Sequence, residues 1–174
     1  MIIEGTSLSG SYVVMPEKIK DERGFFARNF CQKEFDKIDL NTDWVQSNIS
    51  FNSKEGTVRG MHYQKDPYSE VKLVRCTMGA IYDVIIDLRC NSATYKQSFG
   101  IKLSSDNRKA LYIPKGFAHG FQTLANNTEV LYQMSTYYAP EAARGIRWND
   151  PLFNISWPLP ISSITEKDEL YESY

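Results

Sequence analysis

The sequence contains only two histidines, and each lies among residues that could bind an anion or move a proton. His62 lies in residues 59–64 (RGMHYQ), and His119 lies in residues 114–121 (PKGFAHGF). An imidazole exchanges protons near neutral pH, so histidine is the usual general base under these conditions. Together with the neighbouring Arg, Lys, Gln and Tyr side chains, the histidines indicate a site for a small anionic ligand and a proton-transfer reaction.

The strand that carries His62 has two interpretations. A lone strand histidine is usually structural, with its ring hydrogen-bonded to a backbone carbonyl. In an extended strand Gln64 shares the face of His62, whereas Arg59 lies on the opposite face unless Gly60 marks a β-bulge. A polar, partly buried face is more typical of a binding site, and we therefore treat His62 as a candidate general base.

Lys72 and a group of tyrosines are ambiguous when considered by themselves. Lys72 alternates with apolar residues in residues 70–75 (EVKLVR), a pattern that is typical of a solvent-facing strand lysine. Tyr132, Tyr137 and Tyr138 lie in one segment, and tyrosines in β-structure more often pack than react. These patterns leave a structural and a catalytic role open for each residue.

The sequence argues against several common kinds of active site. A catalytic zinc or iron site usually takes three protein ligands, drawn mostly from His, Cys and carboxylates. Two histidines without a His-x-His spacing do not provide such a set, so we expect no metal. The chain also lacks a Gly-x-Gly-x-x-Gly motif, a P-loop and a Gly-x-Ser-x-Gly motif.

The composition is that of one globular domain over residues 1–174, with 42% hydrophobic and 24% charged residues. The net charge of −1 provides no basic field for nucleic acid or a membrane surface. The longest apolar runs, such as residues 84–86, are too short to span a bilayer, and we find no signal-peptide pattern. Three cysteines without a Cys-x-x-Cys spacing favour free thiols in a reducing cytoplasm. We therefore expect a cytoplasmic protein without nucleic-acid or membrane partners.

Short runs rich in Val, Ile, Tyr, Phe and Thr recur along the chain and predict β-strands. The predicted strands are residues 11–15, 44–51, 57–63, 70–76, 80–88, 97–103, 110–113, 120–124 and 130–137. Hairpin turns are predicted at residues 78–79, 105–107 and 126–127, and short helices at residues 32–38 and 165–170. Residues 151–160 predict an irregular segment before a short C-terminal cap. This spacing predicts an all-β fold, a jelly-roll β-sandwich or barrel with short peripheral helices.

A series of motifs in order along nearly the whole chain carries a family resemblance. The motifs are residues 21–26 (DERGFF), 46–48 (QSN), 56–64 (GTVRGMHYQ), 72–75 (KLVR), 83–89 (DVIIDLR), 113–121 (IPKGFAHGF), 137–141 (YYAPE), 145–151 (GIRWNDP) and 167–168 (KD). With these motifs the chain resembles the dTDP-4-dehydrorhamnose 3,5-epimerase family, a metal-free branch of the cupin jelly rolls. The resemblance implies a cupin-like fold, a nucleotide-diphosphate sugar as substrate and no cofactor.

The resemblance also implies a role for each matching residue. His62 matches the general base, Asp168 the carboxylate that orients it, Tyr132 the general acid on the opposite face of the sugar, and Lys72 the cation beside the C4 oxygen. Substrate-binding positions are implied at Gln46, Asn48, Arg23, Arg59, His119, Lys167 and Tyr138, of which Tyr138 would stack on the nucleotide base.

Two positions depart from the family pattern. Arg28 stands where the family usually has a glutamate, and Ala143 stands where a second glutamate commonly follows the tyrosine pair. Both family positions help to hold substrate, and a cation in place of an acceptor inverts which ligand groups can pair there. Arg28 is therefore a candidate substrate-binding residue that would favour a different group on the ligand.

The sequence leads to one main functional hypothesis and two alternatives. We expect an epimerase that inverts C3 and C5 of a nucleotide-diphospho-4-keto-6-deoxyhexose, by default dTDP-4-keto-6-deoxyglucose on the way to dTDP-L-rhamnose. The alternatives are a related epimerase that acts at one centre or on another nucleotide or sugar, and a non-catalytic sugar-nucleotide-binding jelly roll. The family is typically a homodimer that exchanges N-terminal strands, and the apolar residues 1–3 and 11–15 are compatible with an added edge strand.

Overall fold

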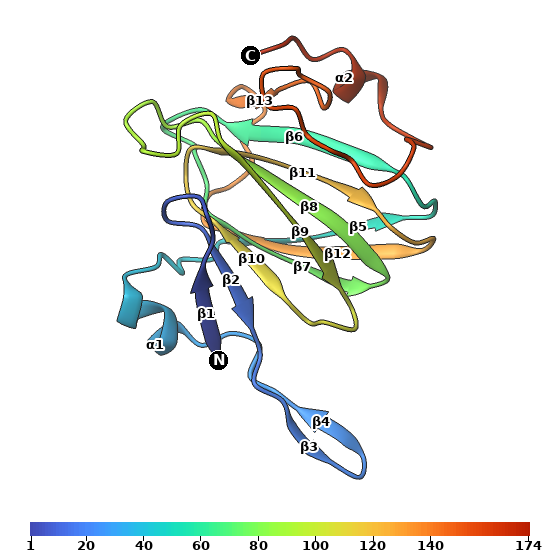
Figure 1. The fold of residues 1–174 in the computed structure, drawn as a ribbon. Helices are drawn as coiled ribbons and strands as arrows, with labels where there is room; N and C mark the ends of the chain where they lie inside the picture. Colours follow the sequence, from blue (N-terminus) through green and yellow to red (C-terminus); the bar gives the residue numbers. More distant parts are fainter.

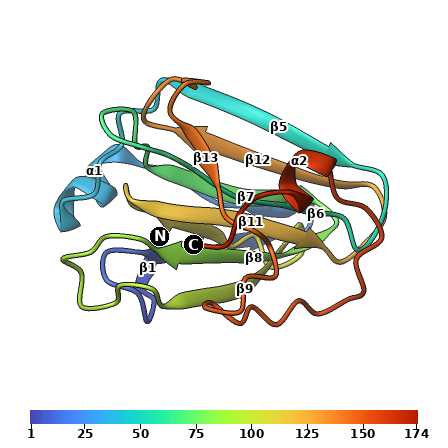
Figure 2. The same ribbon diagram turned by 90° about the horizontal axis from the view of Figure 1, so that it is seen from above.

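The computed structural model describes residues 1–174, and most of the chain forms two antiparallel β-sheets that face one another (Figures 1 and 2). The six-stranded sheet has the spatial order β1 (Ile2–Gly5), β2 (Tyr12–Met15), β10 (Ala110–Ile113), β7 (Lys72–Met78), β12 (Thr128–Met134) and β5 (Gln46–Asn52). The five-stranded sheet has the order β13 (Ala143–Gly145), β6 (Val58–Gln64), β11 (Phe117–Thr123), β8 (Ala80–Asp87) and β9 (Ser98–Ser104). This architecture confirms the predicted all-β, cupin-like jelly roll.

The helices are short and peripheral, as predicted. Residues 32–38 form α1 (Gln32–Phe35) followed by the 3-10 helix η1 (Asp36–Ile38), and the C-terminal helix is α2 (Glu166–Glu169). Thr165 caps α2, because its hydroxyl accepts a hydrogen bond from the backbone N–H of Asp168. None of the helices combines the length and apolar character that crossing a membrane requires.

The predicted strands differ from the observed ones mainly at their ends. Strand β11 begins at Phe117, so His119 lies within the strand. Strand β12 ends at Met134, which leaves Tyr137 and Tyr138 in the following loop. The strands β1, β13, β3 (Ile19–Asp21) and β4 (Gly24–Phe26) were not predicted individually.

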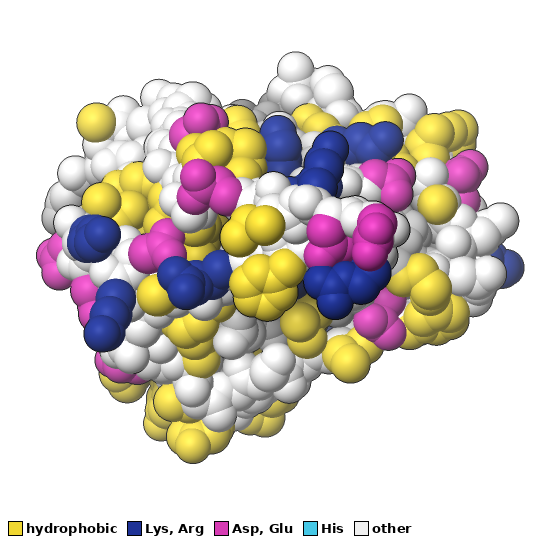
Figure 3. Space-filling model, turned by 90° about the horizontal axis from the view of Figure 1, so that it is seen from below, with side chains coloured by type: hydrophobic (Ala, Val, Ile, Leu, Met, Phe, Trp, Pro, Cys, Tyr) yellow, Lys and Arg dark blue, Asp and Glu magenta, His cyan; other side chains and the backbone are white.

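Strands β3 and β4 form a two-stranded hairpin that projects away from the sandwich (Figure 1). Ile19 on β3 and Phe26 on β4 are 69% and 72% exposed. Figure 3 views the molecule from below, the side toward which the hairpin points in Figure 1, and apolar side chains gather there among charged ones. This hairpin therefore exposes apolar side chains, among charged ones, away from the sandwich.

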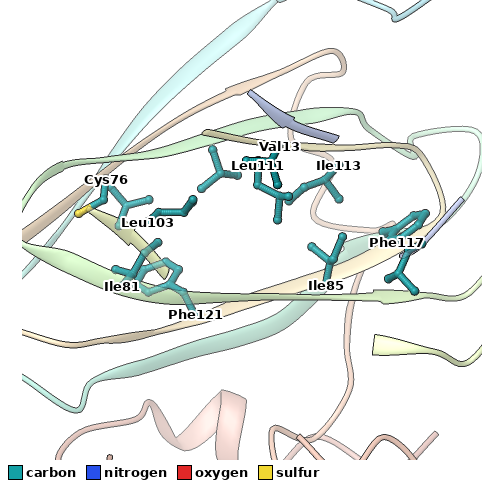
Figure 4. Close-up of a cluster of buried hydrophobic side chains, with 12 residues drawn as sticks. Val13, Cys76, Ile81, Ile85, Leu103, Leu111, Ile113, Phe117 and Phe121 are labelled. Carbon is teal, nitrogen blue, oxygen red and sulfur yellow. The ribbon is translucent and has the colours of Figure 1, made fainter. Parts of the chain in front are cut away.

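The main hydrophobic core lies between the two sheets (Figure 4). Leu111 and Ile113 from β10 pack with Ile81 and Ile85 from β8, and all four side chains are buried. Two further clusters lie on the outer faces. In one, Phe35 packs with Leu73 and Tyr112 on the outside of the six-stranded sheet. In the other, Ile146 and Phe153 pack with Met61 on the outside of the five-stranded sheet.

Strand β5 reverses the usual pattern of an apolar inside and a polar outside. Gln46, Asn48 and Ser50 line cavities inside the sandwich, whereas Ile49 is 65% exposed and Phe51 is also exposed. Because neighbouring strand residues point to opposite faces, a polar inner face places the apolar side chains outside. The interior of the sandwich is therefore polar near β5, and the outer face of this edge strand is apolar.

Candidate functional site

A cavity of about 410 Å³ lies where β5 and β12 of one sheet face β6 of the other. The predicted site residues in its wall are His62, Lys72, Tyr132, Gln46, Asn48, Tyr138 and Lys167. A smaller cavity of about 150 Å³ shares His62, Lys72 and Tyr132 with it and adds Arg59 and His119. Side chains from both sheets, the loop after β12 and α2 therefore surround one polar interior.

His62 and Asp168 form a hydrogen-bonded pair at the wall of this cavity. The His62 Nε2 atom lies 2.7 Å from Asp168 Oδ1, and the backbone N–H of Gly60 donates to Asp168 Oδ2 at 3.0 Å. A carboxylate can only accept, so Nε2 carries the proton of the neutral ring and Nδ1 is left bare. The His62 side chain is 44% exposed, whereas that of Asp168 is buried. The geometry is that of a general base oriented by a carboxylate.

The ionised form of Asp168 is stabilised by its neighbours. Burial acts to raise the pKa of this carboxyl, but the hydrogen bonds from His62, Gly60 and Thr165 and the charge of His62 outweigh it. The pKa of Asp168 therefore lies below its ordinary value. Asp168 is therefore an anion at neutral pH.

Gly60 brings Arg59 and His62 to the same side of β6. The register between β6 and β11 shifts here, with His119 opposite His62 but Phe121 opposite Arg59. Gly60 has φ +115°, and a Cβ atom at this position would lie 2.6 Å from the Cα of Gly120. Only glycine fits this backbone and this close approach. This irregularity is the β-bulge that Arg59 needs in order to share the face of His62. Arg59 Nε donates to Asn52 Oδ1 inside the sandwich at 2.6 Å.

Lys72 is a buried lysine rather than a solvent-facing one. Its Nζ atom lies 3.0 Å from Glu70 Oε1, and both side chains line the larger cavity. The other carboxylate oxygen of Glu70 accepts from Gln64 Nε2 at 2.6 Å. Lys72 therefore presents an ammonium group to the cavity, where it forms an ion pair with the Glu70 carboxylate.

Tyr132 belongs to the sheet opposite His62. It lies on β12 with Asn48 of β5 as its cross-strand partner, and both side chains line the cavity. Burial raises the pKa of the Tyr132 phenol, although the charge of Arg59 and a hydrogen bond with the Asn48 side chain oppose this effect. Tyr132 is therefore a neutral proton donor at neutral pH.

His119 has a carboxylate partner of its own. Its Nε2 atom lies 2.8 Å from Asp83 Oδ1, and both side chains are buried. The second oxygen of Asp83 has no hydrogen-bond partner. His119 on β11 is the cross-strand partner of His62 on β6, so the two histidines lie side by side, one paired with Asp83 on β8 and the other with Asp168 on α2.

Arg23 and Arg28 lie outside the cavities of their own chain that contain His62. Arg23 is at the tip of the β3–β4 hairpin, where it pairs with Asp21 at 2.5 Å. Arg28 follows the hairpin and pairs with Glu34 at 3.1 Å. Ala143, the second departure from the family pattern, lines the larger cavity on β13. The chain thus brings together the other predicted site residues but not these two arginines.

Four residues near this interior were missed by the sequence interpretation. Glu70 lies two residues before Lys72, and this spacing could have indicated a shared strand face. Asp83 was noted only as part of a motif. Arg144 and Tyr171 line the larger cavity, and the Tyr171 ring packs edge-on against His62 with centroids 5.9 Å apart. No local pattern marks Tyr171, because the contact forms between distant segments.

The ionisable residues do not form a recognisable metal site. No group of three or more His, Cys, Asp or Glu side chains is arranged to hold a metal ion. The three cysteines are free, and none lines either cavity described above. The absence of a metal or cofactor from the reaction stays a prediction.

Comparisons of the sequence and of the structure with known proteins lead to the same family. The sequence model of the family described as dTDP-4-dehydrorhamnose 3,5-epimerase matches residues 5–174. A dTDP-4-dehydrorhamnose 3,5-epimerase from Shigella flexneri is 40% identical over 164 residues, which cover 94% of this chain and 90% of that protein. The crystal structure of dTDP-4-dehydrorhamnose 3,5-epimerase from Elizabethkingia anophelis NUHP1 has a TM-score of 0.96 at 36% identity, covering 100% of this chain and 96% of that one. A dTDP-6-deoxy-D-glucose-3,5-epimerase from Legionella pneumophila Philadelphia 1, in complex with dTDP-4-keto-L-rhamnose, has a TM-score of 0.91 at 36% identity, covering 99% and 92%.

Proposed function

From the premise that the chain belongs to the dTDP-4-dehydrorhamnose 3,5-epimerase family, we propose that it converts dTDP-4-keto-6-deoxy-D-glucose into dTDP-4-keto-L-rhamnose. The observation that carries this proposal is the cavity in which the His62–Asp168 pair, Lys72 and Tyr132 converge from two sheets. A base, a cation and an acid are the three groups that inversion next to a ketone requires.

The first step is removal of a proton from the sugar. The C4 ketone acidifies the C–H bonds at C3 and C5, and the bare Nδ1 of His62 accepts the proton. The electron pair of the broken C–H bond enters an enolate, and its charge develops largely on O4. Asp168, which is anionic at neutral pH, offsets the positive charge that appears on the His62 ring.

The second step returns a proton from the other face. Lys72 donates a hydrogen bond to O4 as its charge develops, which lowers the energy of the enolate. Tyr132 belongs to the opposite sheet, and its buried phenol gives its proton to the carbon from the side away from His62. The configuration is inverted, and the His62 imidazolium then releases its extra proton to solvent while the Tyr132 phenolate takes one up. The reaction involves no net oxidation, because the ketone is already present in the substrate.

Residues at the mouth of the cavity suit the rest of the ligand. Lys167 provides a cation for the diphosphate, and Tyr138, which is more than half exposed, provides a ring on which the nucleotide base can stack. Arg59 and His119 line the adjoining smaller cavity, and Gln46 and Asn48 offer amide groups to the sugar.

The test is incorporation of solvent deuterium into dTDP-4-keto-6-deoxyglucose, followed by NMR at C3 and C5. We expect deuterium at both carbons with the wild-type protein and at neither with a folded His62→Ala variant. Deuterium at one carbon only would support the single-centre alternative. Exchange confined to another sugar in a panel of nucleotide-linked 4-keto sugars would identify that sugar as the substrate in place of dTDP-4-keto-6-deoxyglucose. Binding without exchange on any substrate would support the non-catalytic alternative.

We also propose that the active form is a homodimer. The apolar outer face of β5, with Ile49 and Phe51, and the apolar β3–β4 hairpin favour a contact with a second copy. Such a contact would carry Arg23 of one chain toward the cavity of the other chain. This would account for the position of Arg23 outside the cavity of its own chain. Light scattering should give twice the 20.0 kDa mass of one chain. Phe26→Asp should lower this mass, and the matched control Ile38→Asp, at an exposed apolar position on η1, should not.

We further propose a cytoplasmic location. The three free cysteines favour it, because free thiols persist in a reducing compartment. Fractionation of the source cells should recover the activity in the cytosolic fraction, and activity confined to a secreted fraction would contradict the proposal.

A further inference from the structure

We infer that Glu70 is a positioning residue, which holds the Lys72 ammonium group where the C4 oxygen of the substrate is expected. The inference rests on the proposed function for the role of Lys72. The Glu70 side chain is 3% exposed, yet it lies in the wall of the larger cavity. Both of its carboxylate oxygens are occupied, one by Lys72 Nζ at 3.0 Å and the other by Gln64 Nε2 at 2.6 Å.

The arrangement requires a group that only accepts hydrogen bonds. Two donors, from Lys72 and Gln64, converge on Glu70 from different sides. A carboxylate satisfies both, whereas an amide offers one acceptor and would direct its own donor at the other partner. The Lys72 side chain is also largely buried, and a buried ammonium group is favoured when a carboxylate lies next to it. Glu70 therefore determines where the Lys72 ammonium group lies.

Glu70 also connects Lys72 to the loop after β12. Gln64 Oε1 accepts from the backbone N–H of Ala139 at 2.6 Å, and Gln64 Nε2 donates to the Tyr137 carbonyl at 3.3 Å. These bonds hold the backbone on either side of Tyr138. A role for Glu70 in the loop alone would change the binding of the nucleotide, whereas a role through Lys72 would change the chemical step.

The two roles predict different kinetic effects. Negative charge develops on O4 only as the proton leaves carbon, so the contact with Lys72 is stronger in the transition state than in the bound substrate. A displaced Lys72 therefore lowers kcat and leaves KM nearly unchanged. Misplacement of a catalytic group by about 1 Å costs up to about 100-fold in rate.

The experiment is a double-mutant cycle between Glu70→Gln and Lys72→Met, read as kcat and KM for epimerisation of dTDP-4-keto-6-deoxyglucose. We expect Glu70→Gln to lower kcat by about 10–100-fold with KM within about threefold of wild type, and to have no further effect in the Lys72→Met background. If Glu70→Gln does not fold, Glu70→Asp replaces it in the same cycle, because it keeps the charge but is too short to reach both donors.

Two further measurements sharpen the result. In Glu70→Ala the vacated space adjoins the cavity, so sodium formate should restore part of kcat and sodium chloride at equal ionic strength should not. Glu129→Gln is the matched control, since Glu129 is a half-buried strand glutamate that accepts a hydrogen bond from Thr77 outside the cavities containing His62. Its kinetics should be those of wild type.

Several outcomes would overturn the inference. They are wild-type kcat in the folded Glu70→Gln protein, a rise in KM with unchanged kcat, and a full additional loss in the Lys72→Met background. Failure of the proposed function would look different, because the wild-type protein itself would then not epimerise dTDP-4-keto-6-deoxyglucose.

Discussion

Replacement of Asp168 by asparagine tests the pair on which the proposed chemistry depends. Asp168 accepts hydrogen bonds from His62 Nε2 at 2.7 Å and from the Gly60 N–H at 3.0 Å. Asparagine has nearly the same volume, but it offers one acceptor and one donor group. If its NH₂ group faces His62, the ring must present a bare Nε2 and carry its proton on Nδ1. That tautomer blocks the nitrogen that accepts the proton of the substrate.

The size of the effect follows from these contacts. A positioned general base contributes about 10²–10⁴-fold to a rate, and Asp168→Asn removes both the favoured tautomer and the charge that stabilises the imidazolium. We therefore expect kcat to fall by about 10²–10⁴-fold, which corresponds to about 3–5 kcal/mol of transition-state stabilisation. KM should change little, because the imidazolium forms only during the reaction.

The pH dependence of stability provides a second measurement on the same variant. The pKa of Asp168 is lowered in the folded protein, so its contribution to stability is present above the ordinary carboxyl range near pH 4. That contribution is lost as the pH falls through the lower pKa of the folded state. The free energies of unfolding of wild type and Asp168→Asn should therefore converge as the solution is acidified from neutral pH.

The assay is the rate of deuterium incorporation at C3 and C5, measured by NMR on protein whose fold has been checked by circular dichroism. Glu169→Gln is the matched control, since it makes the same chemical change one residue further along α2 at an exposed position. The control should exchange at the wild-type rate. A folded Asp168→Asn protein that exchanges within about threefold of wild type would refute the role assigned to this carboxylate.

Three further predictions concern stability and cofactors. Asp87→Asn should lower the free energy of unfolding by about 1–3 kcal/mol at neutral pH. Burial acts to raise the pKa of this carboxyl, but the hydrogen bonds from Arg89 and neighbouring hydroxyls hold it below its ordinary range. Denaturation at pH 7 measures this loss, and a difference below about 0.5 kcal/mol would contradict it. Gly60→Ala should abolish activity and lower the melting temperature, because the new Cβ would meet the Gly120 backbone at 2.6 Å; a stable, active variant would mean that β6 can be repacked at this point. Exhaustive dialysis against a chelator should leave the exchange rate unchanged, whereas loss of activity that one specific metal restores would contradict the metal-free prediction.

The sequence alone determined those features that depend on local periodicity. Alternation of side chains along a strand is set by the backbone, so the shared face of His62 and Gln64 could be derived without a structure, and both do line the cavity. The same reasoning located most strands and placed turns near residues 78–79, 105–107 and 126–127, but the prediction that these turns are hairpins was wrong, because each connects strands of different sheets. It misjudged Lys72, because alternation identifies the two faces of a strand but does not say which of them another sheet will cover.

Tertiary structure alone decided which of these faces meet. His62 and Asp168 are 106 positions apart in the sequence with no local signal of their hydrogen bond, and only the docking of the C-terminal segment against β6 produces it. The shift at Gly60 likewise depends on the close approach of Gly120 from β11. Arg23 matches a substrate-binding position and Arg28 departs from one, yet the chain leaves both outside its own cavity. Local sequence specifies the direction of a side chain relative to its own strand, whereas the surroundings of that side chain depend on the packing of segments that are distant in sequence.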